Sequence, residues 1–500
     1  MRVFLGNAPW YQGELYGVRA GSRWPHFEDP SGSEYMPFPF FLAYATAVLE
    51  RDVDCEAVLL IDGCAEKIQE EEFCERVERF APDLVVLEVS TASIATDLRV
   101  ANDLARRCPG VQIAFSGLHV FMQEPAFFAA NPAITYVFVG EYEEILRDLV
   151  RALERQRRGG EPALGAIGGL IWRGSDGAIV RNGARPVLQD LDALPWPARH
   201  FLPMYGYYDE PGSIPRPSVQ MWASRGCPYK CVFCAWPQIM YGDSHTQYRV
   251  RDPEDVVAEM QHLVEHYGYK SVYIDDDTFN IGKKRMLAFA KKIKERKLGV
   301  PWAVMARADT SDEATFEAFK DAGMASIKFG VESGDQQIVK DSGKNLNLDR
   351  LRRACAKCHE LGIRIHLTFT FGLPGETKET VQKTIDLAQE LNPHSLQYSI
   401  VTPFPGSRLY QMMDEQGKLE SKDWSLYDGY NNAVMRTETL SAADIADARR
   451  RASAIWDRYR EKRAWADSGQ KIVSGSTLLK AIASPVKATK KLVRLLTPNE

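Results

Sequence analysis

Residues Ser224–Pro237 read SRGCPYKCVFCAWP and place Cys227, Cys231 and Cys234 at a C-x3-C-x2-C spacing. Cysteine thiolate is the usual protein ligand of iron–sulfur clusters. Three ligands leave one iron of a four-iron cube open, and chemistry at a metal needs such a position. Ferredoxins instead use a C-x2-C-x2-C-x3-C run for clusters that only transfer electrons. A zinc knuckle is the alternative, but the nearest candidate for a fourth ligand is His245.

The sequence around this loop alternates strand-like and helix-like patterns from Val219 to about Pro405. The expected strands are Val219–Ala223, Ser271–Ile274, Trp302–Met305, Ser326–Gly330, Arg364–Phe371 and Ser395–Val401. The expected helices between them include Pro253–His266, Lys284–Lys297, Ser311–Ala322, Leu348–Leu361 and Lys378–Leu391. Six successive βα units predict a parallel barrel over residues 219–405 that stays incomplete, because the closed form needs eight. The cysteine loop would follow its first strand, at the end where such barrels hold their active sites.

Residues 1–158 predict a separate α/β domain with a doubly wound, Rossmann-like parallel sheet. Its expected strands are Val3–Gly6, Ala57–Ile61, Leu84–Val89, Gln112–Phe115 and Tyr136–Val139. Amphipathic patterns separate these continuous apolar runs, as in a sheet covered on both faces. Small or polar residues follow the strands, where an open sheet forms its ligand crevice. No G-x-G-x-x-G follows the first strand, so a dinucleotide is not the expected ligand.

Three further regions complete the predicted organisation. Residues 159–218 predict a β-hairpin around Gly174–Gly177 and then a proline-rich linker between domains. Residues 406–465 predict a helical segment on the substrate side of the barrel. Residues 466–500 form a basic, amphipathic tail, a pattern that fits either peripheral contact with an anionic membrane or a solvated tail.

Composition narrows the class of protein. The 500 residues are 45% hydrophobic and 26% charged with a net charge of −5, so no basic field points to nucleic acid as a partner. The first residues lack the pattern of a signal peptide, and no apolar run reaches the roughly 20 residues that span a bilayer. The nine cysteines are an odd number, which argues against a disulfide framework. We therefore expect a cytoplasmic protein.

One cysteine motif is expected to be incidental. Cys355-x2-Cys358-His359 spells the c-type haem attachment motif. It lies inside a helical pattern, in a chain without a recognisable export signal. Both cysteines are therefore expected to be ordinary residues of a barrel helix.

The cysteine loop on the first βα unit resembles the radical S-adenosylmethionine (SAM) superfamily. The domain in front of it resembles the cobalamin-binding domain of the cobalamin-dependent radical SAM proteins. The segments that carry the likeness are PWPARH at 195–200, CAWPQ at 234–238, YRVRDPEDVV at 248–257, IDDDTF at 274–279, FGVESG at 329–334 and FGLPGET at 371–377. The likeness covers roughly residues 1–460, and the hopanoid-associated and anaerobic porphyrin cyclase-like groups look nearest.

The resemblance implies a role for each matching position. Cys227, Cys231 and Cys234 would hold a [4Fe–4S] cluster whose open iron chelates SAM, which one electron cleaves to a 5′-deoxyadenosyl radical. The implied SAM contacts are Phe233, Asp275, Asp276, Asp277, Arg307, Glu332, Ser333, Gly372, Pro374 and Gly375. The aspartates stand where the family commonly has G-G-E, and a solvated, helix-capping turn is the alternative for them. Arg307 would pair with the SAM carboxylate, because arginine presents a planar fork of donors.

Cobalamin is the implied ligand of the front domain. Its implied contacts are Ser90, Thr91, Gly117, His119, Gly140 and Glu141. The domain lacks the D-x-H-x-x-G motif that supplies a histidine to cobalt, so we expect cobalamin to bind base-off, without a histidine on the metal. A domain without a cofactor, serving substrate recognition, is the alternative.

The hypothesis for function is a radical SAM enzyme that methylates an unactivated carbon of a small or lipid-like substrate, with cobalamin as methyl donor. A flavodoxin or ferredoxin would supply electrons. One alternative is radical cyclisation, rearrangement or oxidation without methyl transfer. Another is a non-catalytic cobalamin or iron–sulfur sensor, which the later strand-end motifs disfavour, because a cluster carrier needs no SAM site.

Overall fold

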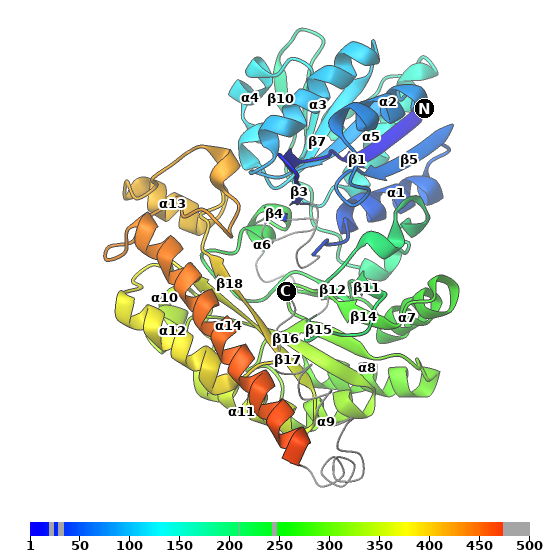
Figure 1. Cartoon of the computed structure of the whole chain (residues 1–500). Helices are drawn as coiled ribbons and strands as arrows, with labels where there is room; N and C mark the ends of the chain where they lie inside the picture. The colour runs from blue at the N-terminus through cyan, green and yellow to red at the C-terminus, as the bar shows by residue number, and fades with distance from the viewer. Residues whose placement is uncertain (20–24, 29–34, 210, 243–247, 474–500) are drawn as a thin grey trace, which may run out of the picture. The chain divides into compact units, whose positions relative to one another are not determined.

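The computed structural model describes residues 1–19, 25–28, 35–209, 211–242 and 248–473 (Figure 1). The chain divides into a large unit, Met1–Ala446, and a small unit, Asp447–Glu500. Helix α14 (Ala442–Val473) begins at the end of the first unit and forms the described part of the second. Most of the predicted basic tail, from residue 474 onward, lies outside the described residues. No helix in the described ranges is long and apolar enough to cross a membrane.

The front domain contains a seven-stranded sheet in the order β10-β9-β8-β7-β6-β1-β5. Its parallel strands are β1 (Arg2–Asn7), β5 (Ala57–Asp62), β6 (Leu84–Val89), β7 (Gln112–Gly117) and β8 (Tyr136–Phe138). The predicted doubly wound sheet is therefore confirmed. The predicted hairpin, β9 (Leu170–Arg173) and β10 (Ile179–Arg181), is also present and extends this sheet, since β9 pairs antiparallel with β8. Turn residues reveal a hairpin in the sequence, but they do not reveal which strand it joins.

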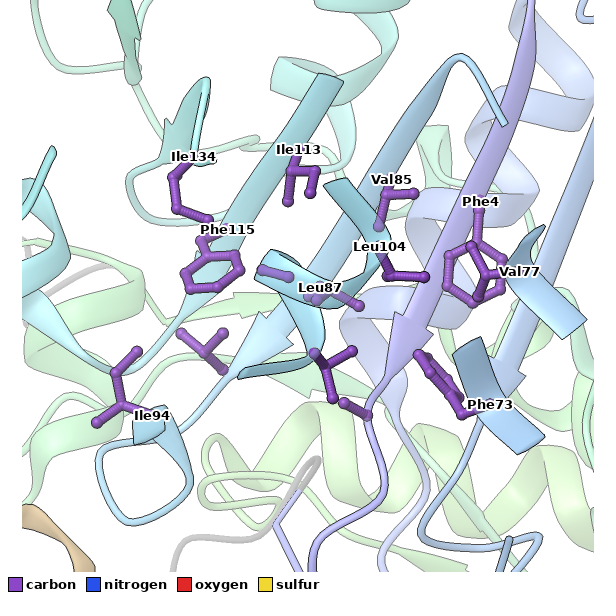
Figure 2. Close-up of a cluster of buried hydrophobic side chains, with 14 of the residues drawn as sticks. Phe4, Phe73, Val77, Val85, Leu87, Ile94, Leu104, Ile113, Phe115 and Ile134 are labelled. Atoms are coloured by element: carbon purple, nitrogen blue, oxygen red, sulfur yellow. The ribbon is translucent and has the colours of Figure 1, made fainter. Parts of the chain in front are cut away.

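Helices cover both faces of this sheet (Figure 1). On one face lie α1 (Phe40–Asp52) and α5 (Glu143–Arg157), and on the other lie α2 (Glu70–Phe80), α3 (Ile94–Arg107) and α4 (Pro125–Ala130). Figure 2 shows the core under α2 and α3, where Phe4 of β1 meets Phe73 of α2 edge to face with ring centroids 5.6 Å apart. Burial of each such side chain contributes roughly 1.5–3 kcal/mol. This packing holds the strand ends in place.

The strand order reverses between β1 and β6, which run side by side. The carboxyl ends of two such strands open a crevice at the switch point of an open α/β sheet. Asn7 ends β1, and Ser90 and Thr91 follow β6 at this point. A small antiparallel sheet of β2 (Tyr11–Gln12), β3 (Leu15–Val18) and β4 (His26–Glu28) follows β1, and the sequence did not predict it.

The second sheet is the predicted incomplete barrel, with six parallel strands in the order β11-β14-β15-β16-β17-β18. The strands are β11 (Ser218–Met221), β14 (Ser271–Ile274), β15 (Trp302–Ala306), β16 (Met324–Glu332), β17 (Arg364–Phe371) and β18 (Ser395–Ile400). The helices that follow them include α7 (Pro253–Tyr267), α8 (Lys283–Arg296), α9 (Glu313–Asp321), α10 (Gln336–Asp341), α11 (Leu348–Glu360) and α12 (Lys378–Leu391). Cys355 and Cys358 are buried in α11, as expected for residues of a barrel helix.

The proline-rich segment before β11 is attached to both sheets. The Tyr207 hydroxyl donates to Asp62 Oδ2 at the end of β5 (3.1 Å). Two residues later, Asp209 pairs with the buried Lys328 of β16 (3.2 Å). The Gly212 amide donates to Ser395 Oγ of β18 (3.3 Å). The described residues of this segment therefore contact both domains through side chains and backbone.

Candidate active site

The cluster loop, Cys227–Cys234, lies between β12 (Ser224–Arg225) and helix α6 (Ala235–Met240). The side chains of all three cysteines are half-buried. Cys231 and Cys234 pack against an apolar cluster that includes Phe233. Gln238 Nε2 donates to the Cys234 carbonyl (2.9 Å), which holds the end of the loop on α6. The loop thus presents three thiols from one short segment, a donor set that fits an iron–sulfur cluster.

A second loop, between α10 and α11, packs on the cluster loop. The Val232 amide donates to the Ser342 carbonyl (2.9 Å). Gly343 has φ +74°, and a Cβ there would lie 2.4 Å from the Lys230 carbonyl oxygen. Glycine is therefore required at this position for both its backbone conformation and its size. The contact brings the next residue, Lys344, toward the cysteines.

Lys344 is a buried cation that sequence reasoning did not identify. Its ammonium donates to Glu332 Oε1 (2.8 Å). Burial raises the pKa of the Cys231 thiol, and the positive charge of Lys344 opposes that rise. Burial also raises the pKa of Cys227 to about 12. The thiols are therefore protonated at neutral pH in the absence of metal, and ligation would release their protons.

Glu332 occupies a strained position at the end of β16. Its φ is +73°, and the pairing with β17 shifts register between Gly330 and Glu332. Bulges and left-handed non-glycine residues concentrate at functional sites. Ser333 differs, because its hydroxyl lies 3.4 Å from Thr384 Oγ1 of α12 and accepts from the Asp335 amide (3.2 Å). The Ser333 side chain is thus engaged by a helix, and a SAM contact for it remains a prediction.

Arg307 braces the cluster loop. Its guanidinium makes two 3.0 Å hydrogen bonds to Asp309 and donates to the Lys344 carbonyl (2.9 Å). Its central carbon lies 3.6 Å from the ring centroid of Tyr229, which stands between Cys227 and Cys231. Three of its five N–H groups are thereby used. Its pairing with the SAM carboxylate remains a prediction.

The three aspartates after β14 are not a solvated turn, so that alternative is wrong. Asp276 is fully buried and accepts from the Ala223 amide (2.8 Å), the Ser224 amide (3.1 Å) and the Ser224 hydroxyl. Burial raises its pKa to about 6. Asp277 accepts from the Gly226 amide (3.0 Å), while Asp275 accepts from the Tyr273 hydroxyl (3.1 Å). Asp276 and Asp277 therefore fix the backbone that enters the cluster loop.

The loop after β17 is closed by a buried glutamate. Glu376 accepts from the Gly372 amide (2.6 Å), and burial raises its pKa to about 8. Gly372 has φ +97°, and a Cβ there would approach the side chains of Val401 and Ile445 to 3.0 Å. Gly375 is also left-handed, at φ +80°. The contacts of Gly372, Pro374 and Gly375 with adenine remain predictions.

One cavity connects the strand ends of the front domain with the cluster loop. The space between its walls, together with the open solvent at its mouth, is about 540 Å³. The front domain contributes Ser90, Thr91 and Leu118, and the cluster loop contributes Phe233 and Cys234. The remaining lining residues are Pro25, Ala235, Trp236 and Phe404. Both predicted cofactor sites therefore open onto the same apolar space, which fits a large ligand on the front domain that faces the cluster.

Three residues that were predicted to contact cobalamin, two glycines and a glutamate, are in close contact with other parts of the protein. Gly117 has φ +108°, and a Cβ there would lie 2.3 Å from the Val89 carbonyl oxygen of the neighbouring strand. At Gly140 (φ +84°) a Cβ would lie 3.1 Å from the Met240 carbonyl oxygen of α6. Glu141 forms ion pairs with Arg225 (2.9 Å) and Arg249 (2.7 Å). A role for them at cobalamin remains a prediction.

His119 is buried and neutral. Burial lowers its pKa to about 4. Its Nδ1 lies 3.4 Å from Thr91 Oγ1, and its ring packs edge-on against Phe121 and Trp424. The histidine is not part of the lining of the cavity. Its contact with cobalamin, without a bond to cobalt, stays a prediction.

A single-ion site is not found among the described residues, where no three histidine, cysteine or acidic side chains converge on one point. Ligands of a four-iron cube need not converge in this way, because each thiolate binds a different iron. His245, the histidine considered for a zinc knuckle, lies outside the described residues.

The fold and site together define a class: a doubly wound domain whose crevice opens on a cysteine loop at the mouth of an incomplete barrel. Comparison with known proteins identifies the family. Residues 223–388 match the radical SAM superfamily, and residues 34–150 match the B12 binding domain. The chain therefore combines a radical SAM domain with a B12-binding domain, and it is an enzyme whose cofactors are a [4Fe–4S] cluster, SAM and cobalamin.

Individual relatives agree with this assignment. An uncharacterised methyltransferase of Pyrococcus horikoshii is 29% identical over 83% of this chain and 86% of its own length. The anaerobic magnesium-protoporphyrin IX monomethyl ester cyclase of Rubrivivax gelatinosus is 25% identical over 89% of this chain and 76% of its own. The fold is similar to that of the radical SAM methyltransferase TsrM from Kitasatospora setae (TM-score 0.62, 19% identity, covering 83% of this chain and 75% of that one).

Proposed function

We propose that the enzyme transfers a methyl group to an unactivated carbon of a small-molecule substrate in the cavity between its two domains. The observation that carries the proposal is that cavity, because strand ends of the B12-binding domain and the cluster loop line it together. When bound, the cluster and SAM supply a carbon radical, and cobalamin supplies a methyl group. Similarity to methyltransferases supports the choice of reaction.

The chain's own residues would prepare this space in three ways. Cys227, Cys231 and Cys234 would hold the cluster at the cavity wall, where Cys234 is part of the lining. Glu332 and Lys344 would offer an anion and a cation to the amine and carboxylate of SAM, since they are the paired buried charges beside the loop. Apolar lining residues such as Trp236 and Phe404 would exclude water from the radical.

The test is an anaerobic assay of the reconstituted full chain with hydroxocobalamin, a one-electron donor, metabolite extract and SAM labelled in its methyl group. Methyl transfer predicts label in a new small molecule, with S-adenosylhomocysteine and 5′-deoxyadenosine in comparable amounts. The Cys231→Ala variant is the control and should yield neither nucleoside. Absence of both from the wild-type reaction would overturn the proposal.

A second function is radical cyclisation, which the similarity to the anaerobic cyclase supports. It predicts 5′-deoxyadenosine without S-adenosylhomocysteine in the same assay. For either reaction we propose a cytoplasmic enzyme that receives electrons from a flavodoxin or ferredoxin. None of the nine cysteines, all of which lie within the described residues, is in a disulfide, and this fits a reducing compartment.

A further inference from the structure

Arg225 connects the cluster loop to the B12-binding domain. It is the last residue of β12, two positions before Cys227, and is only 3% exposed. Its Nη1 donates to Glu141 (2.9 Å), and its Nη2 donates to Glu143 (2.6 Å). Glu141 belongs to the loop after β8, and Glu143 begins α5. One guanidinium thus joins the entrance of the cluster loop to a strand end of the other domain.

A second arginine binds the same glutamate. Arg249 lies in β13 (Arg249–Val250), directly opposite Arg225 in the antiparallel β12–β13 pair. It donates to both oxygens of Glu141 (2.7 and 3.0 Å) and to the Leu188 carbonyl (2.6 Å). Glu141 therefore accepts from two arginines that adjacent strands hold in register.

The exit of the cluster loop reaches the same point. The Glu141 amide donates to the Met240 carbonyl at the end of α6 (3.2 Å). Gly140 packs so closely on that carbonyl that a Cβ would lie 3.1 Å from its oxygen. Residues before and after the three cysteines thus hold the loop that follows β8.

The surroundings leave Arg225 little freedom. Its guanidinium lies over the rings of Phe41 and Tyr44, both at 4.9 Å, and over Trp222 at 5.2 Å. Burial raises the pKa of Glu143, and the charge of Arg225 opposes that rise. A planar fork between two carboxylates and three rings has one orientation, which the point charge of a lysine does not reproduce.

We propose that Arg225 and Glu141 are positioning residues that set the spacing between the cluster and the ligand of the B12-binding domain. The inference rests on the proposed function only because it takes the two groups to be the cluster and cobalamin. Apolar packing alone would hold the domains together with less directional constraint, whereas two arginines on one buried carboxylate fix both distance and orientation.

The experiment measures that spacing in the full chain, loaded with both cofactors and reduced with dithionite. Pulsed electron paramagnetic resonance gives the distance distribution between cob(II)alamin and the reduced cluster. In the wild type we expect one narrow distribution, and in Arg225→Lys a distribution about twice as wide at unchanged iron and cobalamin content. A wild-type width in a fully loaded Arg225→Lys protein would overturn the proposal.

Arg199→Lys is the matched control. Arg199 is 4% exposed, donates to the Gln220 carbonyl (2.9 Å) and Glu259 (3.4 Å), and lies 4.3 Å over Phe38, and these contacts within the described residues do not involve the cluster loop. Its substitution should leave the width unchanged. If Arg225→Lys fails to fold, Arg249→Lys is the second variant. It weakens only one of the two arginine contacts to Glu141 and should also broaden the distance distribution.

A measurement without cobalamin separates this inference from the proposed function. If the wild type retains no cobalamin, the proposed methyl transfer fails, but hydrogen exchange still tests the link. In Arg225→Lys, amide exchange in residues 139–143 and 226–240 should rise together by about tenfold, because the two segments stabilise each other. A rise in only one segment, or in neither, would overturn the positioning role.

Discussion

The cluster loop and the crevice of the B12-binding domain are assembled in opposite ways. All three proposed ligands of the cluster come from one segment, Cys227–Cys234, while the charges around them come from distant residues such as Lys344. The crevice is built from residues that follow separate strands, among them Ser90 and Leu118, with no local motif. A site concentrated in one segment should fail completely when one residue changes. A site spread over several strands should lose function in small steps.

The largest expected effect lies in the concentrated site. Cys231→Ala should remove the visible iron–sulfur absorbance and abolish SAM cleavage, because two thiolates hold a cube poorly. Cys355→Ala, which removes a buried thiol of α11 from the other cysteine motif, is the control and should keep both properties. Four irons and normal cleavage in the Cys231 variant would contradict the assignment of the loop.

The next effect concerns stability in the distributed site. Burial lowers the pKa of His119 from 6.5 to about 4, so its contribution is complete above pH 6.5 and is lost as the pH falls toward 4. The loss amounts to about 3 kcal/mol by linkage. Chemical unfolding at both pH values should show this extra acid sensitivity in the wild type and not in His119→Gln. Equal pH dependence in the two proteins would mean that His119 is not held neutral.

A smaller effect is expected on SAM affinity. Glu332→Gln should retain the cluster and weaken SAM binding by about 1.5–3 kcal/mol, as expected for one charge-assisted hydrogen bond. Calorimetry on the reconstituted protein measures it. Asp209→Asn is the control, since it neutralises the acid of another buried lysine pair in the same barrel, 3.2 Å from Lys328. An unchanged affinity in Glu332→Gln would leave Glu332 a structural role only.

The smallest effect tests cobalt itself. The protein loaded with hydroxocobalamin should retain about one equivalent after desalting, in accord with the crevice rule for open sheets. Its cob(II)alamin spectrum should lack nitrogen superhyperfine splitting, and His119→Ala should leave it unchanged. A splitting that disappears in His119→Ala would show that His119 is the lower ligand of cobalt. One residue would then dominate cobalamin binding in the crevice.

The contrast between local and distributed features also explains which helices and strands could be predicted from the sequence. Apolar runs and amphipathic patterns bounded by turn and cap residues predicted strands and helices at their observed positions, including Ser271–Ile274, Arg364–Phe371 and Lys378–Leu391. The two-residue strands Tyr11–Gln12 and Ser224–Arg225 escaped prediction because so short a run has no measurable period. Tertiary packing, rather than local sequence, decides which strand each of these short strands pairs with.

The site shows a similar limit. The cysteines were evident because their spacing is itself the signal. Lys344 was missed because no sequence pattern marks it. The packing of Gly343 on the cluster loop places Lys344 beside Glu332, and this packing is visible only in the fold. Asp276 also holds the backbone at Ala223 and Ser224, a pairing that neither stretch of sequence predicts, and its contact with SAM stays a prediction. Sequence alone can identify residues that belong to a motif. Residues that act through a partner far away in the chain can be identified only from the fold.

The segment that joins the two domains has a consequence for how such enzymes can be recombined. Tyr207 contacts Asp62 of the front sheet, whereas Asp209 and Gly212 contact Lys328 and Ser395 inside the barrel. A chimera that exchanges the front domain at a junction within 207–212 would leave Lys328 buried without its acid, or Asp62 without its hydroxyl. Junctions on either side of the segment, with the partner residues carried along, should fold. A front domain should therefore be exchanged together with the connection that follows it and the residues that this connection contacts.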